Sequence, residues 1–239
     1  MDTTAFALYS FAVSMENIIN TFMTPITVTL YNYFCKDINI QNTKKLKNLV
    51  LIWGFIIIGA AFPLKWILEN FLHKYIGAIS VMFFLFAAQA FLVVIRGIYV
   101  NIYKAELKQS RYFKQMLIMI TVGTILNGVL YTVFKSMWSI AVATLITSII
   151  WLVICECESK DIRFNSSEYF AIILLLGSYL ICGHKLSAII GMIIYYASGV
   201  VIILLLMRQS TKQIVDIVWI YFKKVYNKLM LINSNHLSK

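Results

Sequence analysis

The sequence predicts an all-α fold, a polytopic membrane bundle of about seven transmembrane helices. Of the 239 residues, 61% are hydrophobic and only 13% are charged, a balance that soluble domains do not have. The apolar residues also fall into long unbroken runs, near the roughly 20 residues that span a bilayer. Because lipid leaves no partner for free backbone groups, only helices or a closed barrel can span it. Long apolar runs favour helices.

Seven runs are candidate spans, and six to eight is the range that the pattern allows. They are Ala5 to Tyr31, Leu49 to Leu64, Tyr75 to Tyr103, Gln115 to Phe134, Ser136 to Cys155, Tyr169 to Gly183 and Leu186 to Met207. The first is the least hydrophobic. The second and sixth are short and would tilt little or lie where the bilayer is thin.

The basic residues lie between the spans and predict an orientation. With the first loop in the cytoplasm, sixteen Lys and Arg residues fall inside and four outside, and Arg96 lies within a span. This bias predicts an outer N-terminus and a cytoplasmic C-terminus. It also explains the net charge of +11 without nucleic acid as a partner. The expected location is the bacterial inner membrane.

Two domains follow, a transmembrane bundle over residues 1–207 and a basic amphipathic tail over 208–239. The apolar tail residues recur at helical spacing opposite charged ones, and we expect this helix to lie on the anionic cytoplasmic leaflet, with a frayed solvated tail as the alternative. The segment from Trp66 to Tyr75 is predicted to be an interfacial turn. The first span follows Met1 at once and has no basic n-region, as expected of a mature helix in a chain that has lost preceding helices.

The first span carries a polar stripe along one face. Its members follow helical spacing, and three further residues widen it: Ser10, Ser14, Asn17, Thr21 and Thr24, then Glu16, Asn20 and Thr27. Polar groups in hydrocarbon are costly unless they face other helices or water. Pro25 is expected to kink this helix, with Thr21 or Thr24 satisfying the freed carbonyl.

Three other spans carry shorter polar faces. Their members are Gln89, Arg96 and Tyr103 at heptad spacing, then Thr121, Thr124, Asn127 and Tyr131, then Thr144, Thr147 and Ser148. Spans one, three, four and five are therefore expected to face a cavity, and the last two to be peripheral. The alternative is packing, since such residues often only join helices, at about 0.6 kcal/mol per hydrogen bond.

Two ionisable residues lie well inside spans. Glu16 is expected to bind a coupling cation or proton, or simply to pair with a neighbour. Arg96 is either a ligand for phosphate or an interfacial anchor, because it lies within reach of the membrane surface. No catalytic residue, metal ligand or cofactor site is predicted. The cysteines Cys35, Cys155, Cys157 and Cys182 show no pairing or zinc-binding pattern.

Two segments resemble the second half of polysaccharide and O-antigen flippases of the multidrug/oligosaccharidyl-lipid/polysaccharide exporter superfamily. One is FMTPITVTLYNYFCKDINIQNTKKLKNLVLIWGF, a polar helix with a proline near its end, a basic loop and an apolar helix. The other is RGIYVNIYKAELKQSRYFKQMLIMITVGTILNGVLYTVF, an aromatic and Asn-rich helix end, a Lys-rich loop and a helix with an asparagine. The resemblance covers Ala5 to about Met207.

The resemblance implies two helical bundles related by pseudo-twofold symmetry, which carry a lipid diphosphate-linked oligosaccharide across the membrane by alternating access. This chain would match the second bundle, without its first helix and with two additional peripheral helices. Its substrate-binding residues would be Arg96, Gln89, Asn17, Asn20, Thr21 and Asn127, and Glu16 would couple an ion.

One bundle cannot enclose a substrate, so the expected partners are membrane lipids, the lipid-linked oligosaccharide and a missing half, in cis or as a second copy. Two alternatives remain at this point. One is a membrane enzyme of the same pathway, such as an O-antigen-type polymerase, although the predicted outer loops are short and the histidines lack a clustered carboxylate. The other is a structural membrane subunit that transports nothing.

Overall fold

The protein is a bundle of long helices, as the sequence predicts. The computed structural model describes residues 3–36 and 38–207, and these ranges contain helices but no strand. In chain order the helices are α1 (Thr3–Phe34), α2 (Ile40–Ile58), α3 (Ala61–Asn70), η1 (His73–Ala78), α4 (Ile79–Val94), η2 (Ile95–Tyr99), α5 (Val100–Ala105), α6 (Gln109–Phe134), α7 (Met137–Glu158), η3 (Lys160–Ile162), α8 (Ser166–Lys185) and α9 (Ala188–Leu206).

Six helical segments of the described chain are long and apolar enough to cross a membrane. They are 40–70, 73–105, 109–134, 137–158, 166–185 and 188–206. Helix α1, with 32 residues, is long enough but more polar than these six. The chain is therefore a multi-pass membrane protein, and α1 is its exceptional helix.

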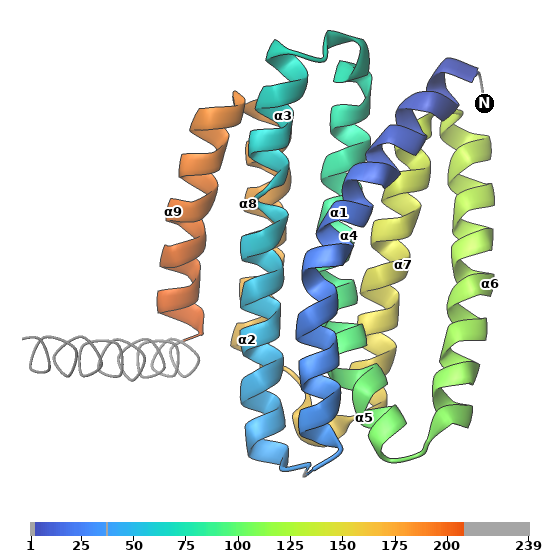
Figure 1. The fold of residues 1–239 in the computed structure, drawn as a ribbon, viewed down its shortest axis with the longest axis vertical. Coiled ribbons are helices and arrows are strands. Elements are labelled where there is room, and N and C mark those ends of the chain that lie inside the picture. Colours follow the sequence, from blue (N-terminus) through green and yellow to red (C-terminus); the bar gives the residue numbers. More distant parts are fainter. Residues whose placement is uncertain (1–2, 37, 208–239) are drawn as a thin grey trace, which may run out of the picture.

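Helix α4 is the centre of the bundle. Its side chains are almost all buried, from Val81 to Val94, and α1, α2, α7 and α8 pack around it. Figure 1 shows α1 crossing obliquely in front of α4, with α6 at one edge of the bundle and α9 at the other. Helix α6 packs on α7, and most of its surface is exposed. The sequence pattern predicts that the last two spans are the peripheral ones and that the fourth faces a cavity, so the exposed position of α6 corrects this prediction.

The second span is longer than its apolar run. The predicted span began at Leu49, but α2 begins at Ile40, where the Asn39 side chain accepts hydrogen bonds from the backbone N–H groups of Gln41 and Asn42. This is an ordinary N-cap, which fixes the start of a helix whatever its hydropathy. At the other end α3 continues to Asn70. The predicted interfacial turn from Trp66 is therefore partly helix.

A π-helical turn, η2, changes the direction in which the third span presents its side chains. Residues Ile95–Tyr99 form a π-helical turn, in which each backbone hydrogen bond spans five residues and not the four of an α-helix. Because this turn accommodates an additional residue, Gln89 and Arg96 do not share a face with Tyr103, although heptad spacing predicts that they do. As described below, Gln89 and Arg96 line one pocket, while Tyr103 lies against Glu158.

The long helices alternate in direction, so that the connections with many basic residues share one end of the bundle (Figure 1). This basic end contains the connections α1–α2, α5–α6 and α7–α8, together with the C-terminal end of α9. Two lysines that are predicted to be loop residues lie in helices instead. Lys47 lies in α2 and Lys65 in α3, and both are buried. The predicted tail helix, 208–239, lies outside the described residues.

The packing of α9 against the end of α8 tests this fold. A Cβ atom on Gly191 would lie 2.9 Å from the Cys182 carbonyl oxygen and 3.0 Å from the Phe62 ring. Because backbone cannot yield cheaply, we expect Gly191→Ala to destabilise the protein by about 1–3 kcal/mol. Gly199→Ala in the same helix is the control, since its Cβ would meet only Leu175, at 3.7 Å. Thermal unfolding in detergent measures both, and equal melting temperatures would contradict the packing.

Candidate functional site

A pocket of about 160 Å³ lies between α1 and the central helix. From α1 it is lined by Asn20, Met23, Thr24, Thr27 and Val28, and from the third span by Gln89, Val93 and Arg96. Five of these eight side chains are polar, although the pocket lies within the membrane-spanning part of the bundle. The two helices thus combine parts of their polar faces in one place.

Arg96 is the charged residue of this pocket, and its side chain is exposed. One guanidinium nitrogen, Nη1, donates a hydrogen bond to Asn20 Oδ1 at 3.3 Å. Arg96 has no ion pair with any carboxylate in the described part of the chain. Since a guanidinium has five N–H donors, most of these donors have no partner among the described residues.

Glu16 lies beside the pocket and not in it. It is half-buried, and its carboxylate accepts a hydrogen bond from the side-chain amide of Gln89, which is itself 2% exposed. The Glu16–Gln89 contact joins α1 to α4 in the interior. Gln89 thus has two neighbours of different kinds, a carboxylate on one side and the pocket on the other.

The structure brings together four of the seven predicted site residues, namely Glu16, Asn20, Gln89 and Arg96. The other three lie elsewhere. Asn17 and Thr21 are on the exposed surface of α1, and Asn127 is on α6. The Asn127 Oδ1 atom is buried and has no hydrogen-bond partner within the described ranges.

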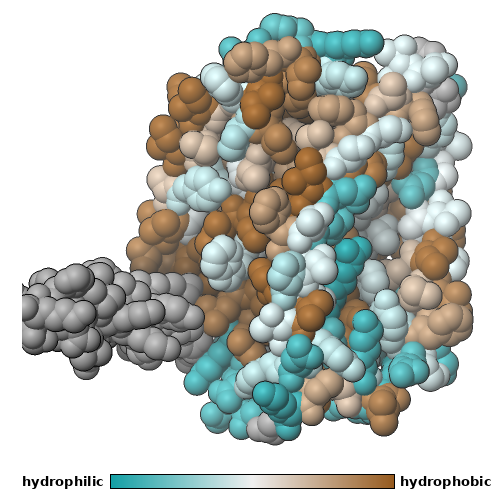
Figure 2. Space-filling model, viewed as in Figure 1, coloured by the Kyte–Doolittle hydropathy of each residue, from teal (hydrophilic) through white to brown (hydrophobic). Residues whose placement is uncertain are grey.

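The polar stripe of α1 faces outwards. Ser14, Asn17, Thr21 and Thr24 are exposed, and Ser10 is half-buried. Figure 2 shows this face as a paler, oblique band along α1, whereas apolar residues dominate towards α9. Thr24 belongs both to the stripe and to the pocket lining. The pocket and the stripe therefore meet at Thr24.

The hydroxyl groups of the stripe bond to their own helix. Ser14, Thr21 and Thr24 each donate to the carbonyl oxygen four residues earlier, at 2.9 to 3.0 Å. The expectation that Thr21 or Thr24 would satisfy the carbonyl freed by Pro25 is therefore wrong, because that carbonyl belongs to Thr21 itself. Each hydroxyl oxygen still has lone pairs to accept a hydrogen bond, and the Asn17 amide has no partner among the described residues.

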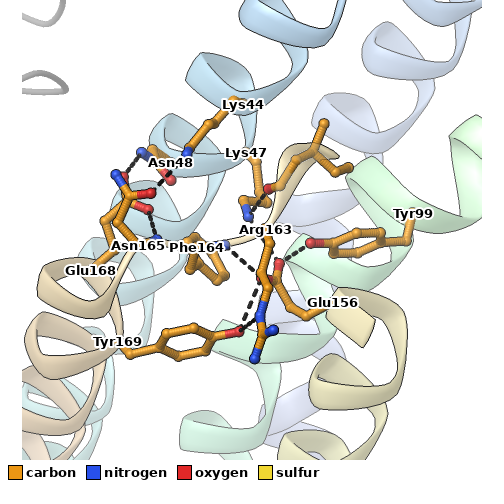
Figure 3. A network of polar contacts seen from close by, with 11 residues as sticks. Lys44, Lys47, Asn48, Tyr99, Glu156, Arg163, Phe164, Asn165, Glu168 and Tyr169 are labelled. Atoms are coloured by element: carbon orange, nitrogen blue, oxygen red, sulfur yellow. Dashed lines mark hydrogen bonds and ion pairs between the residues drawn. The ribbon is translucent and has the colours of Figure 1, made fainter. Parts of the chain in front are cut away.

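In a second polar cluster, which we call the Lys47–Glu156 cluster, the buried charged groups bind one another and their neighbours (Figure 3). The Lys47 ammonium lies 2.8 Å from Glu156 Oε1, and both side chains are at most 1% exposed. Lys47 also donates to the carbonyl of Ile162 and lies 3.4 Å from the centre of the Phe164 ring. The ion pair thus holds α2, the end of α7 and the α7–α8 connection together.

Glu156 is fully engaged. Besides Lys47 it accepts hydrogen bonds from the hydroxyls of Tyr99 and Tyr169 and from the backbone N–H of Phe164, at 2.6 Å. The Tyr169 hydroxyl is also 3.4 Å from Arg163 Nε. That contact raises the pKa of the Arg163 guanidinium, which lies in the connection at the basic end. No lone pair of the Glu156 carboxylate is left aimed at open space, as a buried charge requires.

Further polar contacts hold the two ends of α8. Glu168 accepts from the Asn48 amide at 2.5 Å and from the Asn165 backbone N–H at 2.7 Å, which forms a capping box at the start of α8. At the opposite end of that helix, Lys65 donates to the carbonyl oxygens of Gly183 and Leu186 at 2.8 and 2.7 Å. A cation at the C-terminus of a helix interacts favourably with its dipole.

Sequence reasoning missed this cluster, although a signal for it exists. Lys47 shares the spacing of the buried residues Val50, Leu51 and Phe55, so it belongs to the apolar stripe of α2. The prediction that Lys47 is a loop residue left this spacing unnoticed. Glu156 likewise continues the buried stripe of α7. A charge on a buried face indicates an opposite charge on a neighbouring helix.

Comparison with known proteins finds no match: no family model, no curated protein and no solved structure is similar to this chain. The function of the candidate site must therefore be inferred from its geometry.

The Lys47–Glu156 cluster generates a stability prediction. Lys47→Met leaves Glu156 buried without its counter-charge, so we expect a loss of about 3–5 kcal/mol. The double variant Lys47→Met/Glu156→Gln removes both charges and should be more stable than Lys47→Met alone. Lys45→Met, at an exposed position, is the control and should change little. Denaturant unfolding in mild detergent compares the three, and a double variant no more stable than Lys47→Met would contradict a coupled pair.

Proposed function

We propose that this chain forms one wall of a pathway that carries a lipid diphosphate-linked oligosaccharide across the bacterial inner membrane. Such a flippase would serve the synthesis of a surface polysaccharide, O-antigen or capsule. The observation that carries the proposal is the exposed Arg96 guanidinium in a pocket that continues into the polar face of α1. This combination supplies one group for a diphosphate and a row of groups for sugars.

The charged end of the substrate explains why an arginine is present. A guanidinium is planar and donates two parallel hydrogen bonds to phosphate oxygens, which a lysine ammonium cannot match in geometry. Arg96 engages Asn20 through one nitrogen only. Its other donors have no partner among the described residues and are proposed to bind the ligand. In a membrane an ionisable side chain without an ion-pair partner is expected to serve function.

The sugar part of the substrate explains the stripe. The Asn17 amide has no partner within residues 3–36 and 38–207, and the hydroxyls of Ser14, Thr21 and Thr24 can accept hydrogen bonds while they donate to their own helix. Amides and hydroxyls complement the hydroxyls of an oligosaccharide without holding it tightly. Glu16, which bonds to Gln89 beside the pocket, is the proposed site for a coupling cation or proton.

The open side of the pocket implies a second wall. The stripe faces away from the rest of this bundle, and lipid would leave the Asn17 amide without partners. We propose that an additional bundle faces α1, supplied by an N-terminal half or by a second copy of the chain. Alternating access then moves the two walls relative to each other around the substrate.

The sidedness follows from the positive charge at one end of the bundle. We propose that the basic end, with the C-terminus, lies in the cytoplasm. A reporter enzyme that functions only in the cytoplasm should then be active when it is fused to the C-terminus. A cysteine introduced at Lys135 should react with a membrane-impermeant thiol reagent in intact cells. A cysteine at Lys104 is the matched position at the basic end and should react only after lysis. The reverse pattern would invert the proposed orientation.

Arg96 provides the test of the function. The purified chain in nanodiscs should bind polyprenyl diphosphate more tightly than polyprenol. Arg96→Ala should weaken that binding about tenfold or more, since hydrogen bonds to charged groups contribute roughly 1.5–3 kcal/mol. Arg96→Lys should weaken it less, because the charge remains.

The control for this test is Arg163→Ala, which removes an exposed guanidinium at the basic end and should leave binding unchanged. Intrinsic fluorescence or native mass spectrometry can report the affinity. If Arg96→Ala binds the diphosphate as well as the unaltered chain does, Arg96 is an interfacial anchor and the proposed function loses its support.

A further inference from the structure

We propose that a separate cavity at the basic end of the bundle binds the headgroup of a zwitterionic phospholipid that carries a primary ammonium, of the phosphatidylethanolamine class. The cavity has a volume of about 180 Å³ and lies between the start of α2, helix α5, the start of α6 and the end of α7 with its following connection. None of its lining residues lines the Arg96 pocket.

The walls of this cavity carry charges of both signs. Helices α5 and α6 with their connection contribute Glu106, Lys108 and Arg111, and the end of α7 with its connection contributes Glu158 and Asp161. Lys108 and Glu106 neutralise each other in an ion pair of 2.7 Å. What remains is one guanidinium on the α6 wall and two carboxylates on the α7 wall.

These remaining groups are available to a ligand. Neither the Arg111 guanidinium nor the Asp161 carboxylate has a side-chain hydrogen bond or an ion pair with any residue in 3–36 or 38–207. Glu158 is held in place through Oε2, which accepts from the Gln115 amide at 2.8 Å and from the Tyr103 hydroxyl at 3.1 Å. Its other oxygen has no donor among these residues. The cavity therefore offers a ligand two carboxylates, Glu158 and Asp161, as acceptors and the Arg111 guanidinium as a donor.

A headgroup with both charges matches this arrangement. The phosphate would bind Arg111, and the ammonium would donate to Asp161 and Glu158. An anionic headgroup would leave the two carboxylates without a counter-charge, which costs free energy. A quaternary ammonium, as in phosphatidylcholine, has no N–H group to donate. The primary ammonium satisfies both carboxylates at once.

The position of the cavity favours a lipid over a free metabolite. The basic end of a membrane-spanning bundle lies at the depth of the headgroups. Apolar side chains continue from the cavity along the surface: Leu107, between two lining residues, is 81% exposed, and Phe113 on α6 is 54% exposed. Leu107 has a left-handed backbone, with φ of 57°, in the turn that joins α5 to α6. Its exposed side chain and α6 offer the acyl chains an apolar path.

Native mass spectrometry of the purified full chain tests the proposal with equimolar phosphatidylethanolamine, phosphatidylglycerol and phosphatidylcholine of matched acyl chains. We expect phosphatidylethanolamine to bind best, and its mono- and dimethylated forms to bind progressively more weakly. Arg111→Gln and Asp161→Asn should each reduce binding about tenfold, as the loss of one charged hydrogen bond predicts. Both are exposed positions, where substitution should leave the fold intact.

The matched control is Arg163→Gln, which removes an exposed cation at the same end but outside the cavity lining, and should leave binding unchanged. Circular dichroism confirms that each variant is folded. Preferred binding of phosphatidylglycerol, or equal loss in Arg111→Gln and Arg163→Gln, would show non-specific attraction of lipid to basic residues and overturn the proposal. Unchanged binding by Asp161→Asn would do so as well, because the ammonium would then have no role.

Discussion

The constraint that organises this bundle is that every polar group between its two ends needs a partner, since lipid offers none. Two regions of the chain differ in how far they meet it. In the Lys47–Glu156 cluster the partners are all internal, and two tyrosines, a backbone N–H and a carbonyl complete the ion pair. At Arg96 and along α1 the described residues supply only some of the partners.

The fold was predictable because it depends on apolar runs, which set the number and direction of the helices. The ends of the helices were less predictable, because local caps decide them. With Asn39 as its N-cap, α2 begins nine residues before the predicted apolar run, and Lys47 therefore lies in a helix and not in a loop. The exposed position of α6 was not predictable for another reason. Its composition resembles that of a buried span, and composition alone does not show whether a helix faces lipid or other helices.

The candidate site was predictable in part. Helical spacing identified the stripe on α1, and the ionisable residues Glu16 and Arg96 stood out as charges in apolar surroundings. The spacing did not reveal that Gln89 would bond to Glu16, because contacts between helices depend on their relative rotation. It also misplaced Tyr103, since a heptad assumes a uniform helix and η2 is not uniform. Sequence periodicity thus holds only as far as the helix remains regular.

That irregular turn explains how one helix serves both regions. Arg96 and Tyr99 are three residues apart, a spacing that would place them near each other on an α-helix. In the π-helical turn Arg96 points to the open pocket, while Tyr99 donates to Glu156 in the interior. The closed cluster therefore anchors η2 to α7, and the same turn presents Arg96 to the pocket. Single π-helical turns often mark functional positions, and here the reason is geometric: the extra residue lets a rigid internal contact fix the direction of an exposed charge.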